Sequence, residues 1–423
     1  MYHFVTGENR KGVVLQEYEL ELLTILYHHK LLTTKQMYAF IIQKTDITYI
    51  GFANRVKKLA KLDILVDHEY SLGQKGFRFK YYRIGAKGLE IIIDNQRLTG
   101  KIIRDIYRFS SVRNIDHFLS TQDLVVRTLI DARGEQIEVQ SLSPHEEVMD
   151  VTEQSFAIIP DWLLKTETQT IYIELDTGKE TNKVIKEKVE RYVELSRDQP
   201  DTTHVVFFAI LDDSFSTRHS YGKRFKRVGN IKQALLSVKG INRSNLEIYV
   251  LPLFRAKEKL LEVVKGESPH KEKKRQLDTE LAIHTLDKLN YVFPYMFERQ
   301  DIARYYPDNL ERYYHVDAIY EVSTKGNTKL ETVGVLLLEE GHIKNLDRLD
   351  YNHYLVGAGR FKEKIDRLLV VYANSLEMEE DVIGKQYHLC IIGSMEKWGY
   401  ELEEQPTFYR LSSPYKKEIT HYE

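Results

Sequence analysis

Three carboxylates lie close together in the middle of the chain, and their residue types suit metal-assisted hydrolysis. Asp161 follows Pro160, and Glu174 and Asp176 end an apolar stretch that begins at Thr170. Two carboxylates on adjacent strands can hold a hard divalent cation such as Mg²⁺ or Mn²⁺, while a lysine stabilises charge on the scissile phosphate. The pattern predicts Asp161, Glu174 and Asp176 as metal ligands, with Asp161 and Glu174 also acting in catalysis.

The arrangement of these acids resembles the PD-(D/E)xK nuclease signature, which implies a lysine at position 176, but this chain has an aspartate there. The following loop and helix offer four substitutes, which are Lys179, Lys183, Lys186 and Lys188. We select Lys186 as the catalytic lysine. The alternative is that the acids only end a strand and decorate a turn, since Thr177-Gly178 is a turn signal. Cleavage and a purely structural role therefore both stay open.

The elements that would position these acids alternate between helices and strands. The apolar spacing predicts helices over 117–132, 183–196 and 231–238. It predicts strands over 136–141, 156–165, 170–175, 204–211 and 246–253. This αβββαβ order, with Pro160-Asp161 on one strand and Glu174-Leu175-Asp176 at the end of the next, resembles the PD-(D/E)xK nuclease-like fold. The resemblance implies an α/β domain over residues 111–257.

The first 110 residues predict a different module, with three short helices over 17–30, 34–42 and 47–62. The inward stripe of the third helix is expected to be Ile50, Ala53, Val56 and either Leu59 or Ala60. A strand over 64–70 and an alternating run over 77–83 follow, separated by a glycine-containing turn, which predicts a β-hairpin. The order of helices and hairpin resembles a winged helix-turn-helix, to which we assign residues 1–110.

The outward side of the third helix and the hairpin carry basic and polar side chains that suit contacts with DNA. A recognition helix reads base edges in the major groove, and basic residues near it contact phosphates. The residues expected to contact double-stranded DNA are Tyr49, Asn54, Arg55, Lys58, Lys61, Lys75, Arg78 and Lys80. Residues 1–110 hold 18 Lys and Arg against 11 Asp and Glu, although the whole chain has a net charge of -2. The alternatives are a merely solvated basic face and a protein-binding module.

The succession of these motifs resembles the replication-relaxation family over about residues 15–255. After the N-terminal module, the residues that carry the resemblance are Pro160-Asp161, Glu174-x-Asp176-Thr177-Gly178 and Lys188-x-x-x-Tyr192. The resemblance implies a protein of a plasmid or another mobile element that is associated with DNA replication and relaxation. The family name alone establishes no reaction.

The last third of the chain predicts a second, divergent copy of the nuclease-like unit over residues 283–423. Asp317 echoes Asp161, and Glu339-Glu340, after the apolar run 333–338, echo Glu174. The charged stretch over 258–282 predicts a helix followed by a linker. The alternative is that any α/β domain offers an aspartate and a glutamate at its strand ends. Together these patterns predict an α+β multidomain protein.

Composition excludes several classes of protein. No apolar run approaches the roughly 20 residues that span a bilayer, and the polar N-terminus lacks a signal peptide, so we expect a cytoplasmic protein with no membrane partner. The single cysteine, Cys390, rules out a disulfide framework. The phosphate-cradling P-loop motif does not occur, so no nucleotide cofactor is expected.

Three functions are compatible with these observations. We favour a DNA-binding protein without enzymatic activity, in which the nuclease-like units serve as scaffold or as the platform of a homodimer. The second is a nuclease or nickase that uses Mg²⁺ or Mn²⁺ at Asp161 and Glu174. The third is a protein-interaction adaptor that never contacts DNA.

Overall fold

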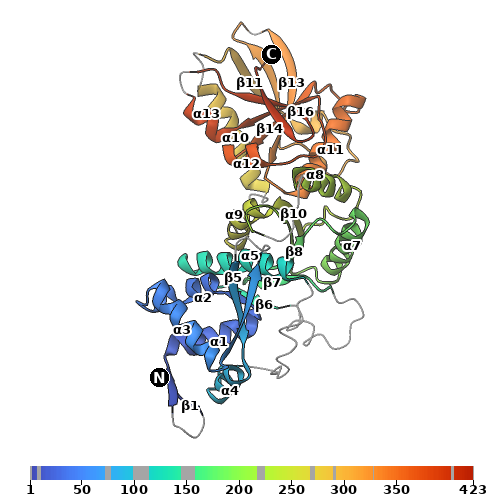
Figure 1. The fold of residues 1–423 in the computed structure, drawn as a ribbon. Helices are drawn as coiled ribbons and strands as arrows, with labels where there is room; N and C mark the ends of the chain where they lie inside the picture. The colour runs from blue at the N-terminus through green and yellow to red at the C-terminus, as the bar shows by residue number, and fades with distance from the viewer. Residues whose placement is uncertain are drawn as a thin grey trace.

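The computed structural model describes residues 2–6, 11–71, 78–98, 114–143, 158–216, 224–266, 272–288, 292–326, 328–401 and 404–422. Within these residues it forms four sheets of two, three, five and seven strands. Figure 1 shows the three larger sheets and their helices stacked one after another along an elongated molecule, in chain order. No helix in these described ranges has the length and the apolar run that a bilayer crossing needs.

The first unit combines four helices with a three-stranded antiparallel sheet of order β3-β5-β4. A hairpin, β1 (Tyr2–Thr6) and β2 (Lys11–Leu15), precedes it. The helices are α1 (Glu17–His29), α2 (Thr34–Ile41), α3 (Tyr49–Lys61) and α4 (Ala86–Asp94). The strands are β3 (Leu32–Thr33), β4 (Leu65–Ser71) and β5 (Arg78–Ile84).

Two threonines begin the second and third helices of this unit. The Thr33 hydroxyl accepts the backbone N–H of Gln36, and the Thr48 hydroxyl accepts that of Gly51. Each bond satisfies a backbone donor that the first turn of a helix leaves free. These two caps therefore fix the residues at which α2 and α3 begin.

The middle unit is a five-stranded sheet of order β10-β9-β8-β7-β6. Its strands are β6 (Gln140–Leu142), β7 (Trp162–Lys165), β8 (Gln169–Asp176), β9 (Thr203–Ile210) and β10 (Leu246–Pro252). Its helices are α5 (Ile115–Gly134), α7 (Asn182–Asp198), α8 (Arg224–Leu235) and α9 (Leu253–Val264). Helix α5 lies between two cores, because Val126 packs into the core of the first unit and Leu124 and Val125 into that of the sheet.

The last unit is a seven-stranded sheet of order β11-β12-β13-β14-β15-β16-β17. Its strands are β11 (Tyr295–Gln300), β12 (Ala318–Thr324), β13 (Lys329–Leu338), β14 (Arg367–Tyr372), β15 (Cys390–Ser394), β16 (Phe408–Ser413) and β17 (Lys416–Thr420). Its helices are α10 (Glu272–Lys288), α11 (Ile343–Ala358), α12 (Ser375–Glu380) and α13 (Met395–Tyr400).

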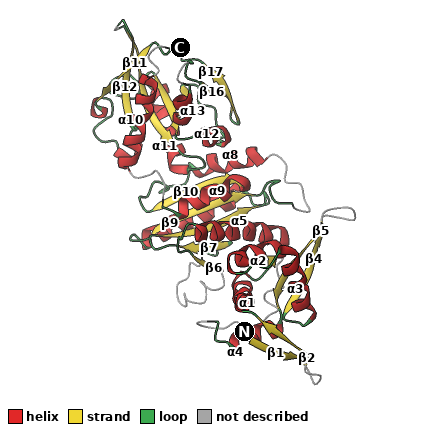
Figure 2. Ribbon diagram, turned by 90° about the vertical axis from the view of Figure 1, so that its left-hand side faces the viewer, coloured by secondary structure: helices red, strands yellow, loops and turns green. Residues whose placement is uncertain are grey.

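Five strands of the two large sheets correspond one to one. In both, the first two neighbouring pairs are antiparallel and the last two are parallel, from β6 to β10 and from β11 to β15. The intervening helices correspond as well: α5 with α10, α7 with α11, α8 with α12 and α9 with α13. Figure 2 shows the two sheets as successive layers with helices against them. The second sheet therefore repeats the topology of the first and adds β16 and β17.

Buried ion pairs join the two sheets. Lys259 of α9 lies 2.7 Å from Glu339 and 2.7 Å from Glu377, and all three side chains are buried. Arg255, one turn earlier, lies 2.7 Å from Glu340. The backbone adds a direct link, because Val250 N–H donates to the carbonyl of Gly341. Since a buried charge is costly unless it is paired, these contacts hold the two sheets in one arrangement.

Gly341 allows this close approach. Its φ of +79° favours glycine, and a Cβ atom there would lie 2.5 Å from Cγ of Leu251. A side chain at position 341 would therefore push the two sheets apart.

The structure corrects three expectations from the sequence. Ile50 does not point inward, because 74% of it is exposed; Phe52 takes its place beside Val56 and Leu59 in the core. The charged stretch over 258–282 was expected to be one helix followed by a linker, but its described residues belong mainly to two helices, α9 and α10, which pack on the two sheets; residues 267–271 lie outside the described residues. The strand expected from 156 begins, within the described residues, only at Trp162.

Candidate nucleic-acid interface and carboxylate cluster

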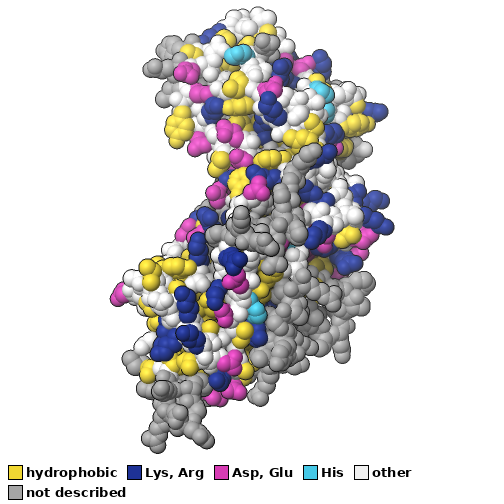
Figure 3. Space-filling model, viewed as in Figure 1, with side chains coloured by type: hydrophobic (Ala, Val, Ile, Leu, Met, Phe, Trp, Pro, Cys, Tyr) yellow, Lys and Arg dark blue, Asp and Glu magenta, His cyan; other side chains and the backbone are white. Residues whose placement is uncertain are grey.

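Helix α3 presents a polar, partly basic side to solvent. Phe52, Val56 and Leu59 face the core, which turns the opposite side of the 13-residue helix outward. The exposed residues are Tyr49, Ile50, Asn54, Lys57, Lys58 and Lys61. Figure 3 shows Lys and Arg side chains gathered on the surface over this helix. Among the described residues, no carboxylate forms an ion pair with these three lysines. Their charges are therefore available to an anionic partner.

Arg55 lies on the same helix but makes its contacts inside the protein. Its guanidinium donates to both carboxylate oxygens of Glu19, at 2.6 and 2.9 Å, and to the carbonyl of Val14. The hydrogen bonds to Glu19 raise the pKa of Arg55. Glu19 in turn accepts the backbone N–H of Gln16 at the start of α1. Arg55 therefore ties α3 to α1, and the sequence pattern had assigned it to DNA because this partner lies 36 residues away.

The hairpin of β4 and β5 carries its basic residues in pairs with acids. Arg78 lies 3.3 Å from Glu69, and Lys80 contacts Asp67; in the register of the two strands both contacts are diagonal. All four side chains are largely exposed, so these pairs are weak and can exchange partners. Lys75, which was also expected to contact DNA, lies outside the described residues.

Asp161 and Glu174 come together at the edge where β7 meets β8. The Asp161 carboxylate accepts the backbone N–H of Leu175 at 2.7 Å and lies 3.1 Å from Nε2 of His117. Burial lowers the pKa of His117, but the bond to Asp161 outweighs it, so the pKa lies above the usual range. We call His117, Asp161, Glu174, Lys188 and Tyr192 the carboxylate cluster.

Both oxygens of Glu174 are engaged by helix α7. Lys188 Nζ donates to one oxygen at 3.0 Å, and the Tyr192 hydroxyl donates to the other at 2.7 Å. Burial, and next the charge of Asp161, raise the pKa of Glu174 to about 7. Lys188 also lies 3.0 Å from Glu180, and its carboxylate neighbours raise its pKa despite burial.

The other predicted members do not join this cluster. Asp176 receives two hydrogen bonds from Arg227 of α8, at 2.7 and 3.0 Å. Lys186 is half-buried on α7, and it is Lys188, two residues on, that reaches Glu174. The described part of the chain contains no group of three or more His, Cys, Asp or Glu placed to hold a metal ion. Asp161, Glu174 and Asp176 therefore do not converge as the sequence had suggested.

The second sheet holds an equivalent of Asp161 but not of Glu174. Asp317 N–H donates to Val335 and its carboxylate accepts Leu337 N–H, just as Asp161 does with Ile173 and Leu175. This register places Leu336, which is fully buried, where the first sheet has Glu174. The expected equivalence of Glu339 and Glu340 with Glu174 is therefore wrong, because these two acids lie beyond the strand and pair with α9 instead.

Arg348 of α11 is the cation that pairs with Asp317 in the second sheet. Its guanidinium donates to Asp317 at 2.7 Å and to the carbonyl of His315 at 2.6 Å. Four residues on, Asn352 accepts the hydroxyl of Tyr306. Arg348 and Asn352 thus lie four residues apart on α11, as Lys188 and Tyr192 do on α7.

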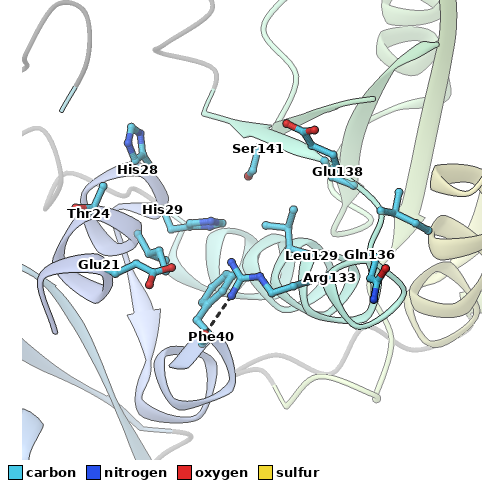
Figure 4. A pocket seen from close by; sticks show the side chains of 13 residues that line it. Glu21, Thr24, His28, His29, Phe40, Leu129, Arg133, Gln136, Glu138 and Ser141 are labelled. Atoms are coloured by element: carbon cyan, nitrogen blue, oxygen red, sulfur yellow. Dashed lines mark hydrogen bonds between the residues drawn. The ribbon is translucent and has the colours of Figure 1, made fainter. Parts of the chain in front are cut away.

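A groove of about 560 Å³ separates the first unit from the middle sheet. Figure 4 shows His29, Phe40, Leu129 and Arg133 around it, with Ser141 on the far side. Arg133 donates to the carbonyl of Phe40 at 3.2 Å, and His29 stacks on Trp162 with ring centroids 5.3 Å apart. The carboxylate cluster does not line this groove. The groove thus marks the packing of the first unit on the sheet.

Comparison with known proteins finds a family model that matches part of the chain. Residues 23–209 match the family model described as Replication-relaxation. No curated protein matches the chain. Among solved structures, it is similar to Bacillus subtilis PadR in complex with operator DNA, with 15% identity over 34% of this chain and 83% of that chain. The TM-score is 0.18, so this likeness carries no argument about the present protein.

Proposed function

We propose that this chain, whose residues 23–209 match the Replication-relaxation family model, binds double-stranded DNA in the replication or maintenance of a plasmid or another mobile element. We further propose that residues 1–110 are a winged helix-turn-helix and that α3 is its recognition helix. The order α1, β3, α2, α3, β4, β5 supports this reading, since a winged helix joins a helix-turn-helix to a β-hairpin.

The observation that carries the proposal is the exposed side of α3. It combines three lysines that lack acidic partners among the described residues with Asn54 and Tyr49, whose side chains can hydrogen-bond to bases or phosphates. Arg55 contributes indirectly, because its bonds to Glu19 fix the orientation of α3 against α1. Arg78 and Lys80 on the hairpin can add phosphate contacts by leaving their exposed acidic partners.

The two sheets then serve as a scaffold with a nuclease-like fold. The strand order and the position of Asp161 and Glu174 support that fold, while the hydrogen bonds that occupy both acids favour a role without cleavage. We propose that the protein acts in the cytoplasm as a homodimer on a site with two-fold symmetry, as is common for proteins with one recognition helix per chain.

The test measures binding of a short, fluorescently labelled DNA duplex by the full chain at a series of salt concentrations. Replacing Lys57, Lys58 and Lys61 by alanine is expected to weaken binding and to reduce the salt dependence, by a slope of about 0.9 for each phosphate that the variant no longer neutralises. Lys364→Ala is the matched control, because Lys364 is also exposed but lies beyond the first unit. Equal binding and equal salt slopes for the triple variant and the wild type would contradict the proposal.

A second candidate function, metal-dependent cleavage of DNA, is favoured by one observation: Asp161, just before β7, and Glu174, on the adjacent strand β8, come together with Lys188 beside Glu174. It is tested by nicking of supercoiled plasmid in Mg²⁺ or Mn²⁺, with Asp161→Ala for comparison. Nicking by the wild type that is absent in the variant would support the nuclease. Indistinguishable results from both proteins would exclude it.

A further inference from the structure

The nuclease-like fold implies a divalent cation beside Asp161 and Glu174, and the residues present do not fit one. A carboxylate binds Mg²⁺ or Mn²⁺ through an oxygen that faces the ion without another cation in between. In Glu174, one oxygen accepts Lys188 at 3.0 Å and the other accepts Tyr192 at 2.7 Å. Only 4% of the Glu174 side chain is exposed, so a hydrated ion has little access to it.

One oxygen of Asp161 is engaged as well. The same oxygen, Oδ2, accepts the backbone N–H of Leu175 and lies 3.1 Å from the imidazole of His117. The third acid of the predicted set, Asp176, is held by two hydrogen bonds from Arg227. Each carboxylate therefore already has a partner from a different element of the fold.

We infer that Lys188 is the resident cation of this site: its ammonium occupies the place beside Glu174 that a divalent metal would take, and the site binds no divalent metal. Lys188 reaches the site from the second turn of α7 and also contacts Glu180, 3.0 Å away, so it has two carboxylates to neutralise. A second cation at the site would face the repulsion of this ammonium across a few ångströms of poorly solvated protein.

The second sheet makes the same substitution in a more complete form. Arg348 emerges from the corresponding turn of α11 and lies 2.7 Å from Asp317, with only 3% of its side chain exposed. Leu336 replaces the glutamate, so a single carboxylate is left for a single cation. In both sheets a basic side chain from the corresponding helix neutralises a carboxylate at this edge: Lys188 of α7 pairs with Glu174, and Arg348 of α11 pairs with Asp317. The lysine of the first sheet therefore follows a pattern that occurs in both sheets.

The inference is tested by thermal unfolding of the full chain with and without millimolar MnCl₂. The wild type is expected to show the same Tm in both conditions. Lys188→Met leaves Glu174 buried beside Asp161 without a cation, and we expect its Tm to fall by roughly 5 °C or more and to recover when Mn²⁺ enters the vacated place. Lys183→Met is the control on the same helix, since 85% of Lys183 is exposed and its nearest acid lies 3.9 Å away.

A double variant keeps the test decisive if Lys188→Met alone fails to fold. Combining Lys188→Met with Glu174→Gln removes both charges, so this protein is expected to be more stable than the single variant and to be indifferent to Mn²⁺. An increase in the Tm of the wild type with Mn²⁺, above that of the double variant, would overturn the inference. So would a Lys188→Met protein whose Tm is the same with and without the ion. DNA binding is not measured here, so these outcomes are independent of the proposed function.

Discussion

The two large sheets have the same strand order, the same strand directions and the same intervening helices, yet they differ in the polar residues at one edge. The first sheet brings together two carboxylates, a histidine, a lysine and a tyrosine. The second retains one carboxylate, Asp317, closed by Arg348, and puts Leu336 in the register position of Glu174. The apolar strands therefore maintain the same topology in both sheets. The residue at one strand position, Glu174 in the first sheet and Leu336 in the second, determines whether two carboxylates come together.

The sheets also differ in what they carry. In the first, α5 packs the first unit against the sheet: the Tyr70 hydroxyl donates to Asp116, and the next residue, His117, contacts Asp161. In the second, the corresponding helix α10 packs on its own sheet and on α13. Among the described residues, the first sheet therefore contacts both the first unit and the second sheet.

The largest expected effect comes from breaking the closed site of the second sheet. Arg348→Ala leaves Asp317 buried without its cation, and we expect the free energy of unfolding to fall by about 3 to 5 kcal/mol. Chemical denaturation of the full chain measures this change. Lys385→Ala, which removes the exposed pair with Asp350, is the control and is expected to cost about 1 kcal/mol or less. Equal losses in the two variants would show that the Arg348 pair does not stabilise the fold.

An intermediate effect is expected from giving the second sheet the acid that it lacks. Leu336→Glu places a carboxyl group in a fully buried position whose nearest cation already serves Asp317, so we expect a loss of roughly 3 kcal/mol. Leu330→Glu on the same strand is the control, because Leu330 is half exposed. If the protein with Glu at position 336 were as stable as the control, the contrast between the two sheets would lose its physical basis.

A smaller effect is the pH dependence that Glu174 gives to the first sheet. Its pKa is raised to about 7 in the folded protein, above the value of an exposed glutamate, so the folded state binds the proton more tightly. The contribution to stability is therefore present at low pH and is lost as the pH rises through 7. Glu174→Gln cannot titrate, and between about pH 5 and pH 8 it is expected to lose roughly 2 kcal/mol less stability than the wild type.

The measurement is the free energy of unfolding of both proteins across this pH range. The difference between the two proteins isolates the contribution of Glu174. Burial also raises the pKa of Glu340 to about 7, and this gives both proteins the same additional dependence of stability on pH. Parallel curves would mean that Glu174 titrates alike in the folded and unfolded chain.

Apolar periodicity was sufficient to predict most of the elements. The strand predicted over 246–253 is β10, which ends one residue earlier, and β8 extends the strand predicted over 170–175 by one residue at each end. These strands are rich in apolar residues, as burial on both sides of a sheet requires. The same pattern placed Glu174 on its strand, whereas Asp161, which it also put on a strand, lies just before β7.

Contacts between distant segments could not be predicted in this way. Nothing in the local pattern of α3 reveals that Arg55 bonds to Glu19. The choice of Lys186 over Lys188 failed because the rotation of α7 is set by its packing, although the spacing of Lys188 and Tyr192 already placed them one turn apart. Glu339 and Glu340 were predicted as the counterparts of Glu174 because they follow an apolar run. The pairing of β12 with β13 fixes the register instead, and it places Leu336 at the equivalent position.

The most direct test of the account is hydrogen–deuterium exchange of the full chain with and without a DNA duplex. If the first unit binds DNA and the sheets serve as scaffold, protection will appear in α3 and in the hairpin of β4 and β5. Helices α7 and α11, which close the carboxylate cluster and its counterpart, will exchange at unchanged rates. Protection concentrated in α7, with α3 unaffected, would contradict the account.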